Sequence, residues 1–551
     1  RPPRSTPSNS SAASDVYKRQ QIFLAAPNKG LKDVLLRRTA LVDNTTGEKI
    51  APQHINLFIA ESVKARGVKP ELYYPDILWP YKKFDVPKGQ CQPIWVSVYV
   101  PKDTKAGQYR GTIEVRPAGA LPQSIQVNLT VWDFNLPDKT HLATVFGFST
   151  MDSMSRFYDF YPGPPRKQAA MVRKYLRFLH DHRINALFYG YITTRDPRIV
   201  SIKEGKNGRL SYDFRKLDPY LELLVSLGMR FNIFAPPFWH NAEAMFKLNP
   251  LLKERFGHLG QKVFDSPEFD RAVADLLESY VKHLRRKGWI KNAFCYIWDE
   301  PPQEMYPHMR KMCQMVKRIA PDVPRMTVAN YAPFDLEGYS DIWCPNLGDA
   351  RSNRGCYDQY KEFYEKRKRA GDEVWWYLAV EPHPYPLWDL DYPLVDCRIT
   401  GWLTWRYGLD GLAYWNVSAW HYNTRPGRKY EGNYSDDPSK RWPNKPWDST
   451  HISSVLGKST FCPGCGQLVY PGPDGPLSST RLEIITAGIE DYEYLRLLDK
   501  QIAALSKKRR TPARERMLRA GERVLSAARR AANRADDWQR DGEKLLALRK
   551  K

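Results

Sequence analysis

Beyond residue 140 the chain repeats one pattern, in which short apolar runs alternate with longer stretches that carry apolar residues at helical spacing. The runs are LATVFGF (142–148), NALFYG (185–190), FNIFAP (231–236), NAFCYIW (292–298), RMTVANY (325–331), DIWCPN (341–346), EVWWYLAV (373–380) and GLAYWNV (411–417). Runs of this length indicate buried strands, and the stretches between most of them indicate helices. Eight strands alternating with helices predict an α/β fold, a (β/α)8 TIM-type barrel with insertions over residues 139–500. Only APFDLEGYS separates the fifth run from the sixth, so one barrel unit is expected to lack a full helix.

A different pattern precedes the barrel. Residues 93–134 hold three runs, WVSVYV, YRGTIEV and SIQVNLTVWDF, which are alternating or β-branched and are separated by turn residues. Together with DVLLRRTALVD upstream, these runs predict an N-terminal β-sandwich domain over residues 21–138.

The first 20 residues, RPPRSTPSNSSAASDVYKRQ, are polar and low in complexity, and they lack the apolar core and cleavage site of a signal peptide. We interpret residues 1–20 as a non-native leader and exclude them from the predicted fold. The natural N-terminus would then be missing, together with strands of the sandwich. If an export signal was lost with it, a secreted or periplasmic bacterial protein is expected.

The composition is that of a globular protein, with 42% hydrophobic residues and no apolar run of about 18 residues that would predict a transmembrane helix. Part of the net charge of +24 lies in residues 501–551, which hold 16 Lys and Arg against 6 Asp and Glu. Apolar residues at helical spacing predict basic C-terminal helices in this segment. A solvated helical face is one interpretation of the charge, and contact with an acidic polymer or surface is the other. No nucleic-acid motif supports a nucleic-acid partner.

Eight cysteines are scattered along the chain, and several lie in apolar runs, where a thiol behaves as a small hydrophobic group. The exception is CPGC at 462–465. A single CxxC pair falls short of the four ligands of a structural zinc site, so no metal or cofactor is assigned to the chain. An inert or disulfide-linked loop, a metal site and a redox role all stay open for Cys462 and Cys465.

The fourth run ends in NAFCYIWDEPP, where Asp299 and Glu300 stand side by side before two prolines. In a barrel this is the C-terminal end of a strand, the face on which such enzymes assemble their active sites. Neighbouring strand residues point to opposite faces, so both carboxylates reach one pocket only if the strand stops or bulges there. Two close carboxylates cannot both ionise freely, which leaves a protonated acid beside an anion. An Asp that caps the next helix beside a salt-bridged Glu is the structural alternative.

Aromatic and polar residues crowd the ends of the other predicted strands. Such side chains suit a sugar ring, whose C–H faces stack on aromatics and whose hydroxyls need polar partners. The residues are Trp239 and His240 after the third strand, Asn330 at the end of the fifth, Tyr377 and Glu381 in and after the seventh, and Tyr414 and Trp415 from the eighth. Together with the carboxylate pair they predict a carbohydrate site.

Three segments carry a resemblance to a known family. YIWDEP, EPHPYPLWDLDYPLVDCRITGWLTWRYGLDGLAYWNVSAW (381–420) and VYPGPDGPLSSTRLEIITAGIEDYEYLRLL (469–498) resemble glycoside hydrolase family 123. Members of this family are β-N-acetylgalactosaminidases with a β-sandwich before a (β/α)8 barrel, and the resemblance covers about residues 90–500. Asp391 and Trp415 lie in the second segment, and the resemblance implies that they contact the sugar.

The resemblance also implies a mechanism in which the sugar's own 2-acetamido oxygen attacks the anomeric carbon and forms an oxazoline-type intermediate. Glu300 would be the general acid and later the base that activates water. Asp299 would hold the acetamido N–H and stabilise its developing positive charge. Tyr377 or Tyr414 would orient the acetamido carbonyl. The expected partner is a glycan or glycoconjugate with a β-linked N-acetylhexosamine.

Two alternatives stay open. An ordinary retaining barrel glycosidase uses an acid/base Glu after strand four and a nucleophilic Glu at the end of strand seven, and Glu300 and Glu381 occupy those places. In that mechanism no acetamido group is required, and plain β-glycosides are substrates. The other alternative is a catalytically silent carbohydrate-binding barrel, against which the intact Asp299–Glu300 pair argues.

Overall fold

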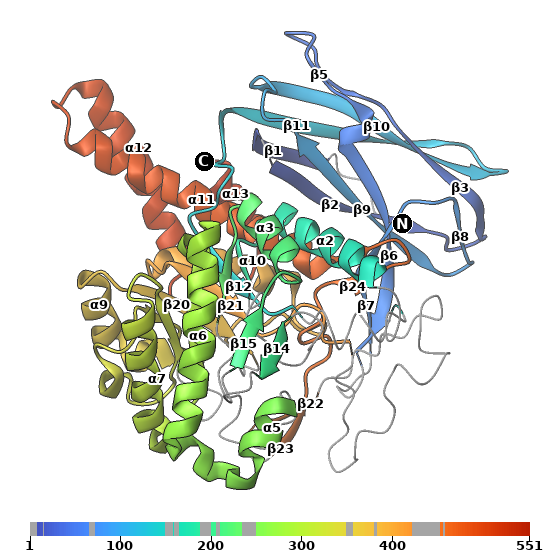
Figure 1. Cartoon of the computed structure of the whole chain (residues 1–551). Helices are drawn as coiled ribbons and strands as arrows, with labels where there is room; N and C mark the ends of the chain where they lie inside the picture. Colours follow the sequence, from blue (N-terminus) through green and yellow to red (C-terminus); the bar gives the residue numbers. More distant parts are fainter. Residues whose placement is uncertain are drawn as a thin grey trace.

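The computed structural model describes residues 8–14, 16–65, 72–148, 158, 165–187, 200–204, 210–233, 250–348, 356–379, 383–420, 452–455 and 458–551 (Figure 1). Two β-sheets face each other in the N-terminal part, and a curled parallel sheet with surrounding helices follows them. The prediction of an α/β fold with an N-terminal β-rich region is therefore confirmed.

The N-terminal part is a sandwich whose two sheets bury one apolar cluster between them, with Val34, Ile94 and Ile113 among its members. The first sheet has the order β1 (Ser8–Ser14), β11 (Gln123–Asn135), β10 (Gly107–Ala118), β3 (Leu31–Arg38) and β8 (Phe84–Val86), with β4 (Leu41–Asp43) and β5 (Lys49–Ile50) beside it. The second has the order β2 (Val16–Ala25), β9 (Cys91–Val100), β6 (Ile55–Lys64), β7 (Tyr73–Pro80), β25 (Pro476–Ser479) and β24 (Tyr470–Pro471). The three predicted runs form β9, β10 and β11, with β9 in the second sheet and the other two paired in the first.

The limits of the sandwich differ from those that the sequence predicts. Residues 8–14 and 16–20 were assigned to a non-native leader, yet they form strands that pair with β11 and β9. The side chain of Arg19 in β2 is buried and pairs with Glu483 and Glu490. Because ladder hydrogen bonds use only backbone groups, a polar and low-complexity composition does not exclude a strand. The second sheet also includes β24 and β25, which follow the curled sheet in the sequence.

All eight predicted runs contribute strands, and each strand pairs in parallel with its neighbours. They follow chain order and the last pairs with the first, so the sheet curls into a ring around apolar side chains such as Phe294, Met326 and Ile342. The strands are β12 (Ala143–Phe146), β13 (Ala186–Leu187), β16 (Arg230–Asn232), β17 (Ala293–Asp299), β18 (Arg325–Val328), β19 (Ile342–Trp343), β20 (Glu373–Leu378) and β21 (Gly411–Tyr414).

Helices surround the ring. They are α2 (Pro165–Asp181), α3 (Asp218–Ser226), α5 (Pro250–Phe256), α6 (Pro267–Lys287), α7 (Tyr306–Ile319), α8 (Cys356–Gln359), α9 (Lys361–Arg369), α10 (Leu394–Arg406) and α11 (Thr480–Ser506). The hairpins β14 (Ser201–Glu204)–β15 (Leu210–Asp213) and β22 (Ile452–Val455)–β23 (Lys458–Phe461) lie outside the ring. Between β18 and β19 the chain forms only the 3-10 turn Pro333–Leu336, as the short segment there predicts. The predicted (β/α)8 repeat is therefore only partly regular, because the chain between β18 and β19, all of which the structure describes, forms no α-helix.

The C-terminal segment consists of the end of α11, α12 (Pro512–Ala531) and α13 (Gly542–Arg549), so the predicted boundary at residue 500 falls inside a helix. In Figure 1, α12 lies beside the end of α11, and the two project together from the ring and its helices. The side chain of Arg549 is 5% exposed and bonds to Asp491 at 2.8 Å, so the end of the segment is part of the folded core. In the part of the chain that the structure describes, no helix is long and apolar enough to cross a membrane.

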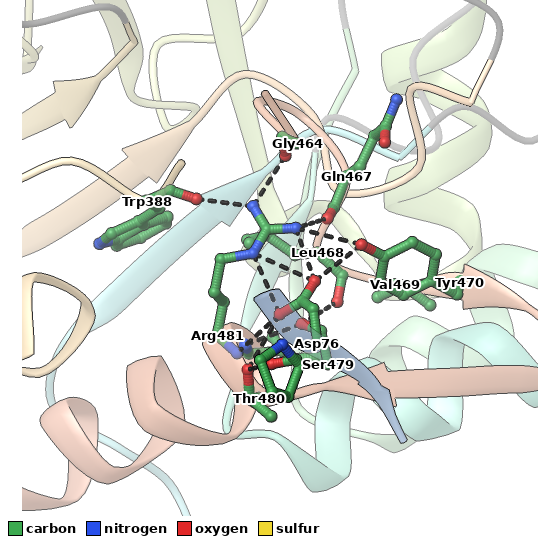
Figure 2. A network of polar contacts seen from close by, with 12 residues as sticks. Asp76, Trp388, Gly464, Gln467, Leu468, Val469, Tyr470, Ser479, Thr480 and Arg481 are labelled. Carbon is green, nitrogen blue, oxygen red and sulfur yellow. Dashed lines mark hydrogen bonds and ion pairs between the residues drawn. The ribbon is translucent and has the colours of Figure 1, made fainter. Parts of the chain in front are cut away.

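A buried ion pair joins the sandwich to the helices. Arg481, in the first turn of α11, and Asp76, on β7, are at most 2% exposed and meet at 2.9 Å (Figure 2). Further hydrogen bonds to the pair involve the carbonyls of Trp388, Gly464 and Gln467 and the hydroxyls of Tyr470 and Thr480. The pair therefore fixes β7, the start of α11 and two loops in one arrangement.

Substituting one partner tests this role. Arg481→Met leaves the Asp76 carboxylate buried without its cation, so we expect a loss of about 3–5 kcal/mol of unfolding free energy in urea. Arg519→Met is the matched control, because Arg519 is 61% exposed and faces Glu515 one helical turn away. That variant should lose less than about 0.5 kcal/mol. Equal losses in the two variants would contradict the special role of Arg481.

Candidate active site

The carboxylates at the end of β17 reach one side of the sheet because the strand is irregular there. The register with β18 shifts between Tyr296 and Trp298. Tyr296 faces the apolar interior of the ring, whereas Ile297 and Trp298 both pack with the outer cluster. Ile297 is therefore an extra residue in β17 relative to β18, which makes a β-bulge. The bulge returns the side chain of Asp299 to the interior side. The strand thus bulges at the place where two adjacent carboxylates require it in order to reach one pocket.

Glu300 turns toward the same opening through its backbone. Its φ of 43° lies in the left-handed region, which costs a non-glycine residue roughly 1 kcal/mol. Strand β17 ends at Asp299, and Pro301 follows Glu300 without an amide donor for further pairing. Glu300 is exposed and Asp299 is half-buried, so the pair stands where the interior of the ring meets solvent.

Each carboxylate accepts a hydrogen bond from a buried tyrosine. The hydroxyl of Tyr296 donates to Oδ1 of Asp299. The hydroxyl of Tyr377, on β20, donates to Oε1 of Glu300. Asn330, just past β18, donates to the Tyr377 hydroxyl at 2.7 Å and lies 3.4 Å from Glu300 Oε1. The ends of β17, β18 and β20 therefore converge on the pair.

Asn330 is held in this orientation from the next strand. The backbone N–H of Asn346, beyond β19, donates to Asn330 Oδ1 at 3.2 Å. The Asn346 side chain in turn accepts the Gly348 N–H at 2.7 Å. Because its oxygen is engaged, the Asn330 amide presents its N–H groups to Tyr377 and Glu300.

The surroundings of Asp299 raise its pKa toward neutral pH. Burial and the neighbouring Glu300 raise the pKa of Asp299 to about 6, and the hydrogen bond from Tyr296 opposes that rise. Asp299 is therefore mostly ionised at neutral pH. Burial also raises the pKa of Tyr296 and Tyr377 well above the usual value, with the adjacent carboxylates adding to the effect. Both hydroxyls consequently stay protonated and act as donors.

Tyr414 and Trp415 lie in a different environment from Tyr377. The aromatic side chain of Tyr414 packs on the outer side of the curled sheet, with its ring centroid 4.7 Å from that of Trp388. Its hydroxyl accepts the Gly466 N–H at 2.8 Å. The half-buried Trp415 donates its indole N–H to Cys465 Sγ at 3.3 Å. Of the two candidate tyrosines, the structure thus brings Tyr377 to the carboxylates.

Of the remaining predicted contacts, the structure describes only Asp391. Asp391 is half-buried in the loop after β20, and burial raises its pKa. The adjacent Leu390 packs with side chains of β7, β24 and β25, toward the sandwich. Trp239, His240 and Glu381 lie outside the described residues.

The CPGC motif lies beside Trp415. Cys462 and Cys465 are buried free thiols. Burial raises the pKa of Cys465 well above its usual value, so the thiol stays protonated. Among the described residues, no group of three or more His, Cys, Asp and Glu side chains is placed to hold a metal ion.

Sequence reasoning missed Tyr296 and Asn346. Residues three apart point to opposite faces of a regular strand, so Tyr296 joins Asp299 only through the bulge. Asn346 acts partly through its backbone N–H, which any residue except proline could supply. The one available signal was that both stand in apolar runs close to the predicted active-site face.

Comparison with known proteins identifies a family whose models match this chain. The family model described as glycoside hydrolase 123, catalytic domain, matches residues 169–498, and that described as glycoside hydrolase 123 N-terminal domain matches residues 19–117. A solved family 123 glycoside hydrolase from Clostridium perfringens, studied for glycolipid glycan hydrolysis, has a TM-score of 0.69 at 15% identity, covering 95% of this chain and 93% of that chain. A family 39 glycoside hydrolase from Bacteroides cellulosilyticus has a TM-score of 0.37 at 11% identity, over 87% and 81% of the two chains. No curated protein sequence matches significantly.

The raised pKa of Asp299 predicts a stability effect with a definite sign. A folded-state pKa of about 6 exceeds the unfolded value of about 3.9, so the stability contribution of Asp299 falls as the pH rises from about 4 to about 6 and stays low above that. Asp299→Asn should therefore raise the unfolding free energy by about 2 kcal/mol near pH 8 and change it little near pH 4. Asp213→Asn is the control, because Arg215 lowers the pKa of Asp213 and the sign should reverse. Urea unfolding at both pH values measures this, and a loss of stability at pH 8 for Asp299→Asn would contradict the assignment.

Proposed function

The chain belongs to glycoside hydrolase family 123, and from this membership we propose that it releases β-linked N-acetylgalactosamine from glycans by substrate-assisted catalysis. The observation that carries the proposal is the placement of Asp299 and Glu300 on one side of one strand end. Adjacent carboxylates in this position can address two points of the same sugar, the glycosidic oxygen and the 2-acetamido group. The closed order of the eight parallel strands supports assigning the curled sheet to the TIM-barrel class.

Glu300 is suited to the role of general acid. It is exposed, so it can approach a bond between the sugar and its leaving group. Without substrate its Oε1 accepts the Tyr377 hydroxyl, and once Tyr377 turns to the sugar the Glu300 carboxyl is free to carry the proton that passes to the leaving oxygen. After the leaving group departs, the same carboxylate takes a proton from the water that opens the oxazoline-type intermediate.

Asp299 is suited to stabilising the acetamido group. With a pKa of about 6 it is mostly anionic at neutral pH. When the acetamido oxygen bonds to the anomeric carbon, positive charge develops on the acetamido nitrogen. An anion that accepts the N–H lowers the energy of this charge more in the transition state than in the ground state.

Tyr377 is the residue that we assign to the acetamido carbonyl. Its hydroxyl donates to Glu300 in the present structure, and on substrate binding it would donate to the sugar instead. Asn330 would keep the tyrosine oxygen in place through its own 2.7 Å hydrogen bond. Asp391, Trp415 and the residues outside the described part, Trp239, His240 and Glu381, complete the proposed sugar contacts.

Double displacement through Glu381 is the competing mechanism, and the two mechanisms differ in what they require of the sugar. If the acetamido group is the nucleophile, a thiazoline mimic of the cyclised intermediate should inhibit strongly. An aryl β-glycoside with a 2-hydroxyl group should react about a thousandfold slower than its 2-acetamido counterpart, because the intramolecular nucleophile is lost. A 2-fluoro glycoside that labels Glu381, with the thiazoline ignored, would overturn the proposal. Binding without turnover of any glycoside would indicate a silent carbohydrate-binding barrel.

The two carboxylates should respond differently to leaving-group quality. Glu300→Gln should lower kcat/KM by about 100- to 10,000-fold for a poor leaving group, and much less for a good one, since protonation then matters less. Asp299→Asn should impair both kinds of substrate, because the acetamido charge develops in either case. Steady-state kinetics on aryl 2-acetamido-β-galactosides with graded leaving groups measures this. Equal and small losses in all combinations would show that the pair is structural.

A further inference from the structure

Tyr296 contacts the candidate site and has no role in the mechanism described so far. Its ring is buried inside the ring of strands with Phe294 and Met326. Its hydroxyl donates to Oδ1 of Asp299. Its backbone N–H donates to Oδ1 of Asn232, at the end of β16, at 2.8 Å. The neighbouring strand therefore fixes the residue that holds Asp299.

The β-bulge makes this contact possible. In a regular strand Tyr296 and Asp299 would point to opposite faces, with Trp298 inside. In this structure Trp298 is fully buried among the outer helices, and the two polar residues share the interior. The bulge thus creates a specific pair of hydroxyl and carboxylate rather than merely ending the strand.

We propose that Tyr296 is the positioning residue of Asp299, whose Oδ1 it occupies so that Oδ2 faces the acetamido N–H of the substrate. This inference rests on the proposed function, in which Asp299 receives that N–H. Because Oδ1 accepts the Tyr296 hydroxyl, Oδ2 is the oxygen left to accept the single N–H of a 2-acetamido group.

The hydroxyl also maintains the charge state that this task requires. A hydrogen bond donated to an ionised carboxylate favours the ionised form, whereas burial and Glu300 favour the protonated form. The Cys344 thiol, just past β19, also faces Asp299, and burial raises the pKa of this thiol well above its usual value, so it stays neutral. Tyr377 acts on the pair through Glu300. Among the described groups that act on Asp299, Tyr296 is the one that opposes its protonation.

The pH profile of Tyr296→Phe tests the inference. The wild-type acid limb of kcat/KM on an aryl 2-acetamido-β-galactoside should lie near pH 6, where Asp299 takes up a proton. Without the donor the pKa of Asp299 rises further, so the limb should move to higher pH by about one unit. The matched control is Tyr492→Phe, which removes a buried hydroxyl that bonds to the Leu409 carbonyl, remote from the pair. Its acid limb should stay where the wild type has it.

A second measurement does not depend on any substrate. Because Tyr296→Phe raises the pKa of Asp299, it should enlarge the loss of stability between about pH 5 and pH 8 relative to wild type. In an Asp299→Asn background the same substitution should leave this pH dependence unchanged, since the titrating group is absent. Urea unfolding of the four variants at both pH values completes the cycle.

The outcomes separate the inference from the proposed function. A shifted acid limb and a pH-dependent coupling to Asp299 support the inference. An unmoved limb, or a stability change equal in both backgrounds, overturns it, even if the enzyme prefers 2-acetamido substrates. Coupling to Asp299 without any preference for 2-acetamido substrates would instead reject the proposed function and reduce Tyr296 to a residue that sets the charge of Asp299.

Discussion

The ion pair of Arg481 and Asp76 links residues that are 405 positions apart in the sequence. Removing both charges from water is costly, and their attraction offsets that cost only when the remaining donors and acceptors are also satisfied. The guanidinium meets this condition, because all three of its nitrogens donate to oxygen acceptors (Figure 2). The orientation of the sandwich, the start of α11 and the loops before β24 all depend on this arrangement.

Helix α11 extends the same principle along its length. Its buried carboxylates are matched by cations from distant segments, with Glu483 bonded to Arg19 and Asp491 bonded to Arg398 and Arg549. These cations are buried structural partners, so they are not free to bind a polyanion. Because each is matched by a buried carboxylate, these pairs contribute little to the net charge of +24, which comes from the rest of the chain.

The candidate site combines two local irregularities that the ring of strands supports. A bulge turns Asp299 inward, and a left-handed backbone turns Glu300 toward the same opening. Both cost conformational energy that the surrounding packing must offset. The half-buried anionic Asp299 adds to that cost, which is a common relation between function and stability at active sites.

Much of the architecture could be read from the sequence. The apolar runs identified the ring strands, the short APFDLEGYS segment identified the unit without a helix, and the prolines after Glu300 identified a strand end, because these features depend on local composition and spacing. Strands β1 and β2 could not be read from their polar residues, since backbone pairing and distant ion pairs hold them.

The sequence alone also could not separate Tyr377 from Tyr414, which both stand in apolar runs of similar composition. Alternation along a strand assigns side chains to two faces but does not say which face lies inside the ring. That choice depends on ring closure, and at Asp299 it also depends on the bulge, where one extra residue reverses the faces of the residues that follow. The chemistry of Asp299 and Glu300 was therefore visible in the sequence, whereas the tyrosines that hold them were decided by tertiary structure, because contacts between strands set the facing of each residue.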